Sequence, residues 1–144
     1  MILDEPTSGL DPAATAEVLQ AIVAHVAAGD ATVFFSSHQI AEVEQIADRV
    51  TIIDRGRTVV EGGLEEFREN YCRIHLVFGS DAPEPAFQTA GILRAQRSGR
   101  ALTLLSSGGA EQIVAEARAL HPVSVEVLPV TLKEIFLETI REEG

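Results

Sequence analysis

The chain has 144 residues, with 22 acidic and 11 basic side chains and a formal net charge of -11. Hydrophobic residues make up 46% and charged residues 23%, which predicts a folded core and argues against a disordered tail. The negative charge repels phosphate backbones and anionic lipids, so a protein that coats nucleic acid or a membrane surface is not expected. No apolar run approaches the roughly 18 residues of a membrane span, and no signal-peptide pattern is visible, so we expect a cytoplasmic chain.

Strand and helix patterns alternate through the first half of the chain. Ile2 and Leu3 are typical of the end of a strand, and a loop follows them. Asp11 and Pro12 predict a helix start, because the carboxylate can accept bonds from backbone N–H groups and proline lacks only a donor that would be unpaired there. Further elements are expected at 31–35 (a strand covered on both faces), 39–47 (a helix), and 50–54 and 57–61 (a hairpin). This order predicts an α/β sheet.

A different pattern begins near residue 71. Alternating apolar residues predict strands near 74–78, 91–96, 101–105 and 123–127, with a helix at about 113–120 before the last of them. The order is close to a β-α-β-β-α-β split unit of the ferredoxin-like type, with a weak first helix near Phe87. Thr131 and Glu134 form a capping box for a final amphipathic helix. We therefore predict an α/β domain at 1–70 and a small α+β domain at 71–144.

Two adjacent carboxylates, Asp4 and Glu5, follow the first predicted strand. Neighbouring negative charges disfavour each other's ionisation, so the pair would be costly at the end of a buried strand without a cation. The chain turns at Pro6, and both carboxylates can face the crevice beyond the strand, where α/β sheets bind ligands. A phosphoryl site would use Asp4 to hold Mg²⁺ through water and Glu5 to orient and polarise the attacking water. The alternative is a solvated turn, which would be preferred for an isolated Asp-Glu pair.

The tripeptide Ser36-Ser37-His38 follows the next predicted strand, so it is expected at the same sheet edge as Asp4 and Glu5. An imidazole there can donate to a γ-phosphate oxygen and respond to the presence of that phosphate. The alternative is a helix-capping turn that contains an incidental histidine. For this segment taken alone, the alternative would be preferred.

Taken together, these segments carry a family resemblance. Residues Ile2 to Pro12 closely resemble the Walker B strand and D-loop of ATP-binding cassette (ABC) transporter ATPases. The tripeptide Ser36-Ser37-His38, followed by Glu42, by 48–50 and by 54–57, is similar to that family's switch histidine and following strands. The resemblance covers residues 1 to about 70 and implies the C-terminal half of a P-loop-type parallel sheet. It implies Asp4 as the Mg²⁺ residue, Glu5 as the catalytic carboxylate and His38 as the γ-phosphate contact. It also implies a loop that reaches a second ATPase subunit, formed by Ser8, Gly9, Leu10 and Asp11.

Residues from about Tyr71 resemble the small accessory domain that follows the ATPase core in ABC-2-type exporters, a group that includes drug- and antibiotic-export ATPases. The recognisable part is the segment Thr131 to Leu137. The resemblance implies a parent protein that hydrolyses MgATP and drives export. Its implied partners are a second ATPase subunit and a membrane-spanning permease, at the inner face of the cell membrane and without nucleic acid.

The phosphate-binding loop of such an ATPase is not found in this sequence. That loop needs Gly-x-x-x-x-Gly-Lys followed by Ser or Thr, whereas the single lysine, Lys133, lies in the predicted C-terminal helix. In the resemblance, that loop, the Gln loop and the Leu-Ser-Gly-Gly-Gln signature would all lie before Met1. We therefore expect the C-terminal portion of an ABC ATPase, from a truncated gene, an internal start or deliberate shortening. Alone, it is expected neither to bind nor to turn over ATP with useful affinity.

Two other hypotheses stay open. One is a non-enzymatic module in which residues 71–144 fold independently and dimerise or dock on a partner. The other is a gene remnant without function, which an in-frame upstream sequence encoding the missing motifs would argue against.

The remaining candidate residues are expected to be structural. His25, His75 and His121 have no second ligand at metal-binding spacing. Cys72 is expected to be an inert buried thiol. Four arginines are expected on a solvated face, because no aromatic residues interleave with them: Arg94, Arg97, Arg100 and Arg118.

Overall fold

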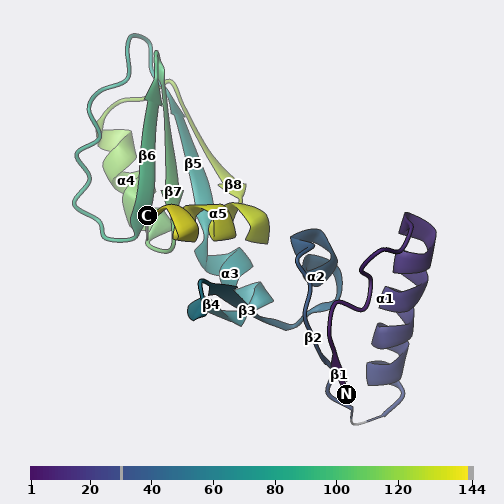
Figure 1. Cartoon of the computed structure of the whole chain (residues 1–144). Coiled ribbons are helices and arrows are strands. Elements are labelled where there is room, and N and C mark those ends of the chain that lie inside the picture. Colours follow the sequence, from purple (N-terminus) through teal and green to yellow (C-terminus); the bar gives the residue numbers. More distant parts are fainter. Residues whose placement is uncertain (30, 143–144) are drawn as a thin grey trace. The chain divides into compact units, whose positions relative to one another are not determined.

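The computed structural model describes residues 1–29 and 31–142 and has a mixed α/β fold (Figure 1). The chain divides into two compact units, Met1–Val50 and Thr51–Gly144. Each unit is described by itself below. Among the described residues, no helix combines the length and the apolar character needed to cross a membrane.

The first unit contains a short parallel sheet and two helices. Strand β1 (Ile2–Leu3) pairs in parallel with β2 (Phe34–Phe35), as predicted for the first two strands. Helix α1 (Pro12–Ala27) begins after Asp11, whose side chain accepts bonds from two backbone N–H groups of the first turn, so the predicted cap is confirmed. Helix α2 (Ile40–Ile46) also lies where a helix was predicted.

The expectation that the second strand is covered on both faces is wrong for this structure. The strand comprises only residues 34–35, and Phe34 is 67% exposed. Its register partner Ile2 is 83% exposed. A sheet of two short strands has few neighbours to cover it, so the apolar side chains that mark a buried parallel strand face solvent here.

The second unit begins with a hairpin and a short helix. Strand β3 (Arg49–Asp54), which crosses the division between the units, pairs with β4 (Arg57–Gly63) as predicted. The two turn residues, Arg55 and Gly56, have φ values of 47° and 77°. Positive φ at both positions is the requirement of a tight turn that matches the twist of a hairpin. Helix α3 (Leu64–Asn70) follows and buries its apolar side toward this unit.

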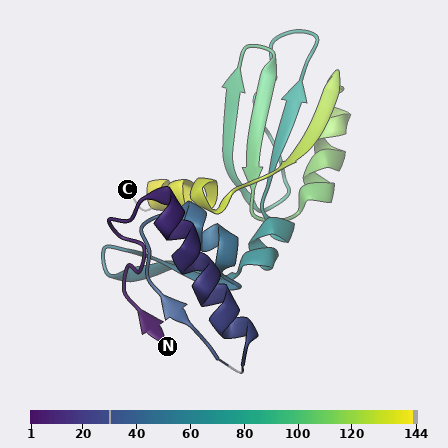
Figure 2. The same cartoon turned by 90° about the vertical axis from the view of Figure 1, so that its right-hand side faces the viewer.

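A four-stranded antiparallel sheet forms the centre of the second unit (Figure 2). Its strands are β5 (Cys72–Val77), β6 (Ile92–Ser98), β7 (Ala101–Ser106) and β8 (Ser124–Pro129), in the spatial order β6-β7-β5-β8. Helix α4 (Ala110–Ala119) lies along one face of this sheet (Figures 1 and 2). The core between them consists of buried apolar residues, chiefly Ile74, Leu76, Leu102, Leu104, Ile113 and Ala117.

The weak first helix expected near Phe87 does not form in the described segment 78–91. Pro83 and Pro85 cannot donate helix hydrogen bonds. The backbone N–H groups of Gln88 and Thr89 instead donate to the carboxylate of Glu116 on α4, at 2.7 and 2.8 Å. The strand order agrees with a split unit, but one crossover carries no helix, so the ferredoxin-like assignment stays a prediction.

The Glu116 carboxylate gives this loop a pH dependence. The hydroxyl of Thr89 and the backbone N–H of Gln88 donate to it and hold its pKa below the usual value. Because the folded-state pKa is lowered, the resulting stability is present above the ordinary glutamate pKa and is lost as the pH falls through the lowered value. We expect the difference in unfolding free energy between wild type and Glu116→Gln to be largest near neutral pH and to vanish in acid, measured by urea unfolding at a series of pH values. A pH-independent difference would contradict this.

Helix α5 (Leu132–Glu142) contacts β4 and lies across one end of the sheet (Figures 1 and 2). Its Glu134 pairs with Arg73 of β5, and its Glu138 lies 3.5 Å from Arg94 of β6. Both arginines are register partners of Leu105, on the face opposite the α4 core. The predicted capping box is confirmed, because the backbone N–H of Thr131 donates to Glu134 Oε2 at 2.9 Å and the Glu134 N–H donates back to the Thr131 hydroxyl.

Candidate functional site

The loops that leave the two parallel strands of the first unit are joined by one hydroxyl group. The backbone N–H of Ser36 donates to the carbonyl of Leu3, which extends the ladder by one bond. The Ser36 hydroxyl donates to Asp4 Oδ1 at 2.5 Å and accepts the backbone N–H of Glu5 at 2.8 Å. The strand-end argument predicted that these loops meet, and they do. The bridging role of Ser36 was not predicted.

Glu5 and His38 form a direct pair. Glu5 Oε2 lies 2.8 Å from Nδ1 of His38, and the two side chains are 35% and 70% exposed, respectively. The backbone of Glu5 has φ of 46°, a left-handed conformation that is uncommon outside glycine and is found at sites where the surroundings enforce it. The arrangement places a carboxylate and an imidazole together where a ligand can reach both.

The loop Ser8–Asp11 is exposed and ordered by local bonds. Its Gly9 adopts φ of 76°, a conformation that glycine tolerates without strain. Leu10 is an exposed apolar side chain at the tip. Asp11 uses its Oδ1 to accept two backbone N–H groups of α1 at 2.9 and 3.0 Å. In this unit, Asp11 therefore acts as a helix cap, while Leu10 remains available for contacts with another molecule.

A second connection between the two loops involves Glu42 of α2. Its Oε2 accepts the hydroxyl of Thr7 at 2.5 Å and that of Ser37 at 3.3 Å. Sequence reasoning missed this cluster, since Thr7 and Glu42 lie 35 positions apart. Glu42 belongs to the segment that carries the family resemblance, but nothing in its spacing from His38 indicates a bond to Thr7.

The oxygen-rich side of this site fits a magnesium ion only in part. Asp4 is exposed, and a carboxylate retains further acceptor sites after it has accepted one hydroxyl. Among the described residues, no three His, Cys, Asp or Glu side chains are grouped to hold a metal. Mg²⁺ usually keeps several waters and binds through one or two carboxylates together with substrate phosphates. Asp4 suits that kind of binding and does not suit an all-protein cage.

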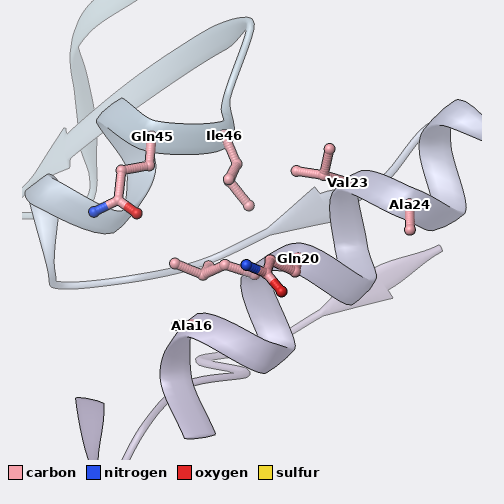
Figure 3. Close-up of a pocket in the computed structure, with 7 residues that line it drawn as sticks. Ala16, Gln20, Val23, Ala24, Gln45 and Ile46 are labelled. Atoms are coloured by element: carbon pink, nitrogen blue, oxygen red, sulfur yellow. The ribbon is translucent and has the colours of Figure 1, made fainter. Parts of the chain in front are cut away.

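The first unit also has an open groove between α1 and α2, of about 480 Å³ (Figure 3). Val23 of α1 and Ile46 of α2 point toward one another across it. The groove has no ionisable side chain, and none of the candidate residues Asp4, Glu5 and His38 lines it. Acid–base chemistry therefore belongs to the loops and not to this groove.

Comparison with known proteins identifies the group to which the chain is similar. No protein-family model matches it. The ABC transporter ATP-binding protein YtrB of Bacillus subtilis (strain 168) is 29% identical over 137 residues, which are 95% of this chain and 47% of YtrB. The daunorubicin resistance ATP-binding protein DrrA3 of Streptomyces coeruleorubidus is 32% identical over 154 residues, 95% of this chain and 46% of DrrA3. The chain is related to the ABC transporter ATP-binding proteins.

Exporters are among these ABC relatives. The Nod factor export ATP-binding protein I of Rhizobium leguminosarum bv. viciae is 29% identical over 146 residues, 99% of this chain and 46% of that protein. The predicted resemblance to ABC transporter ATP-binding proteins, with export types among them, is therefore confirmed. The chain spans about half the length of the curated relatives it matches.

Proposed function

We propose that the chain is part of the ATP-binding subunit of an ABC exporter, and that the complete subunit hydrolyses MgATP to drive transport. In this proposal residues 1–70 are the C-terminal part of the ATPase core, with a P-loop-type parallel sheet, and residues 71–144 are a ferredoxin-like accessory domain. The observation that supports it best is the pairing of Glu5 with His38 at 2.8 Å, beside Asp4, where two adjacent parallel strands end.

Three side chains share the proposed chemistry. Asp4 holds Mg²⁺ through its water shell, and Glu5 orients the attacking water and accepts its proton. When bound, Mg²⁺ neutralises charge that develops on the transferring phosphoryl group. His38 donates a hydrogen bond to a γ-phosphate oxygen.

The contact between Glu5 and His38 limits which proton His38 can offer. An ionised Glu5 accepts only a proton carried on Nδ1, the nitrogen it faces. In a neutral imidazole, Nε2 is then an acceptor and cannot donate to phosphate. His38 therefore donates from Nε2 only as an imidazolium, or it leaves Glu5 when nucleotide binds.

The partners follow from the same proposal. The exposed loop Ser8–Asp11, with Leu10 at its tip, contacts a second ATPase subunit. A membrane-spanning permease receives the mechanical work, with the ATPase in the cytoplasm at the inner face of the cell membrane. The net charge of -11 argues against nucleic acid as a further partner.

Hydrolysis provides the test. The 144 residues contain no phosphate-binding loop motif, so the purified chain is expected to show no saturable, Mg²⁺-dependent ATP hydrolysis. A chimera in which the chain replaces the matching half of DrrA3 is expected to hydrolyse MgATP, because the remaining half of that ATP-binding protein is expected to supply the loop. A chimera that folds and binds nucleotide but does not hydrolyse it would contradict the proposal.

A second candidate function is a non-enzymatic interaction through the edge strand β8. Val127 on this strand and Val123 just before it are exposed apolar side chains at an edge where backbone groups can pair with another strand. If the edge dimerises, light scattering of the full chain should show a dimer in wild type and a monomer in Val127→Glu. The matched exposed substitution Leu137→Glu on α5 should leave the dimer intact. A monomeric wild type would exclude dimerisation through this edge.

A further inference from the structure

Glu42 is a buried carboxylate that the proposed chemistry does not use. Its residue is 6% exposed, and the hydroxyl-bearing Thr7 that donates to it is 1% exposed. Burying a carboxylate is costly unless it is well hydrogen-bonded, and an apolar residue of similar volume would fill the same space at lower cost. An apolar residue in this place could not accept the hydrogen bonds that the Glu42 carboxylate accepts.

The two donors to Glu42 belong to the two loops of the candidate site. Thr7 lies two positions after Glu5, and Ser37 immediately precedes His38. Both hydroxyls reach the same oxygen, Oε2, at 2.5 and 3.3 Å. The Ser37 hydroxyl also accepts the backbone N–H of Gln39 at 3.0 Å, which fixes the turn that carries the imidazole. One carboxylate oxygen thus ties together the two loops that present Glu5 and His38.

We propose that Glu42 is a positioning residue that sets the approach of the Glu5 carboxylate to the His38 imidazole. The Ser36 bridge joins the two loops at Asp4, and Glu42 joins them a second time through Thr7 and Ser37. With both connections made, the loops cannot separate without breaking a charge-assisted hydrogen bond. The positioning itself does not depend on the proposed function. Only the use of the Glu5–His38 pair in ATP hydrolysis rests on that proposal.

The chemistry of the carboxylate explains why glutamine is not equivalent at this position. Both hydroxyls bond to one oxygen, and an amide oxygen also has two lone pairs, so glutamine differs from glutamate by its lack of negative charge and by its NH₂ group, which can only donate. Hydrogen bonds to an ionised acceptor are also about twice as strong as neutral ones. Glu42→Gln preserves shape and volume, so it weakens the connection without opening a cavity.

The test measures the coupling between Glu5 and His38 by NMR on the full 144-residue chain without nucleotide. The probe is the Nδ1 resonance of the His38 ring, assigned by its loss in His38→Gln. In the wild-type background, Glu5→Gln is expected to shift this resonance because the two atoms are 2.8 Å apart. In the Glu42→Gln background, most of that response is expected to be lost, although the chain remains folded by far-UV circular dichroism.

Matched variants separate positioning from general stability. Thr7→Val removes the hydroxyl at nearly constant volume and should also abolish the response, whereas Thr7→Ser keeps the hydroxyl and should preserve it. Glu17→Gln removes a charge from the exposed side of α1 and should preserve the response. If Glu42→Gln does not fold, the Thr7→Val and Thr7→Ser pair decides the question.

Two outcomes would overturn the inference. One is a full Glu5→Gln response in the Glu42→Gln or Thr7→Val background, and the other is no response in wild type. Because no nucleotide is present, the result is independent of hydrolysis by the chimera. If the Glu5–His38 coupling persists without Glu42 while the chimera hydrolyses MgATP, only the positioning role of Glu42 is contradicted. If the coupling requires Glu42 while the chimera is inactive, only the proposed function is contradicted.

Discussion

Truncation of Leu104 to alanine is expected to lower the unfolding free energy of the Thr51–Gly144 unit by about 2 to 5 kcal/mol. Leu104 is 0% exposed and lies between Ile74 on β5 and Ala95 on β6. Its side chain belongs to the core between the sheet and α4. The substitution removes buried methyl groups and leaves a cavity. The cavity can close only partly, because β7 is held by hydrogen bonds to β5 and β6 on its two sides and the neighbouring side chains are closely packed.

Urea unfolding followed by the fluorescence of Tyr71, the single tyrosine of the chain, measures this unit in the absence of tryptophan. The matched control is Leu105→Ala, one residue further along β7. Leu105 points to the opposite face, between Arg73 and Arg94, and is only half-buried. Its truncation should cost clearly less. Equal losses from the two variants would mean that the alternation of faces along β7 is wrong.

That alternation is the reason why most of the second half could be predicted. On β5, Ile74 and Leu76 face the core while Arg73 and His75 face away, which is the period of a half-buried strand. The turn at Arg55-Gly56 and the capping box at Thr131 are equally local signals. The loop 78–91 could not be predicted in the same way, because Glu116, a distant residue, holds its backbone.

In the candidate site, too, one part could be predicted from local sequence signals and another part could not. Asp4, Glu5 and His38 were predicted to converge because the carboxyl ends of adjacent parallel strands share one edge, and this rule needs no knowledge of side-chain contacts. The bonds that hold them, from Ser36 to Asp4 and from Thr7 to Glu42, join residues 32 and 35 positions apart. Serine and threonine are common loop residues, so nothing in their spacing marks these two as structural. Only the folded arrangement distinguishes them.

Replacement of Glu5 by glutamine in the active chimera is expected to lower the rate of MgATP hydrolysis roughly 100- to 10,000-fold, the usual contribution of a positioned general base. The amide keeps the volume of the carboxylate and can still accept a hydrogen bond from His38 Nδ1, 2.8 Å away in the wild type, so the loop should be retained. It cannot take a proton from water. Nucleotide binding, measured by equilibrium titration, should therefore change little while the turnover rate falls.

The control for this substitution is Glu17→Gln, which removes one carboxylate from exposed α1 and should leave turnover unchanged. His38→Ala adds the second half of the argument. If Glu5 and His38 act as a unit, the double variant should be little slower than the slower single variant, because removing either partner already disables the pair. Multiplicative losses would mean that the two residues act separately, and unchanged turnover in Glu5→Gln would remove Glu5 from the chemistry altogether. The pairing seen between Glu5 and His38 favours the first of these results.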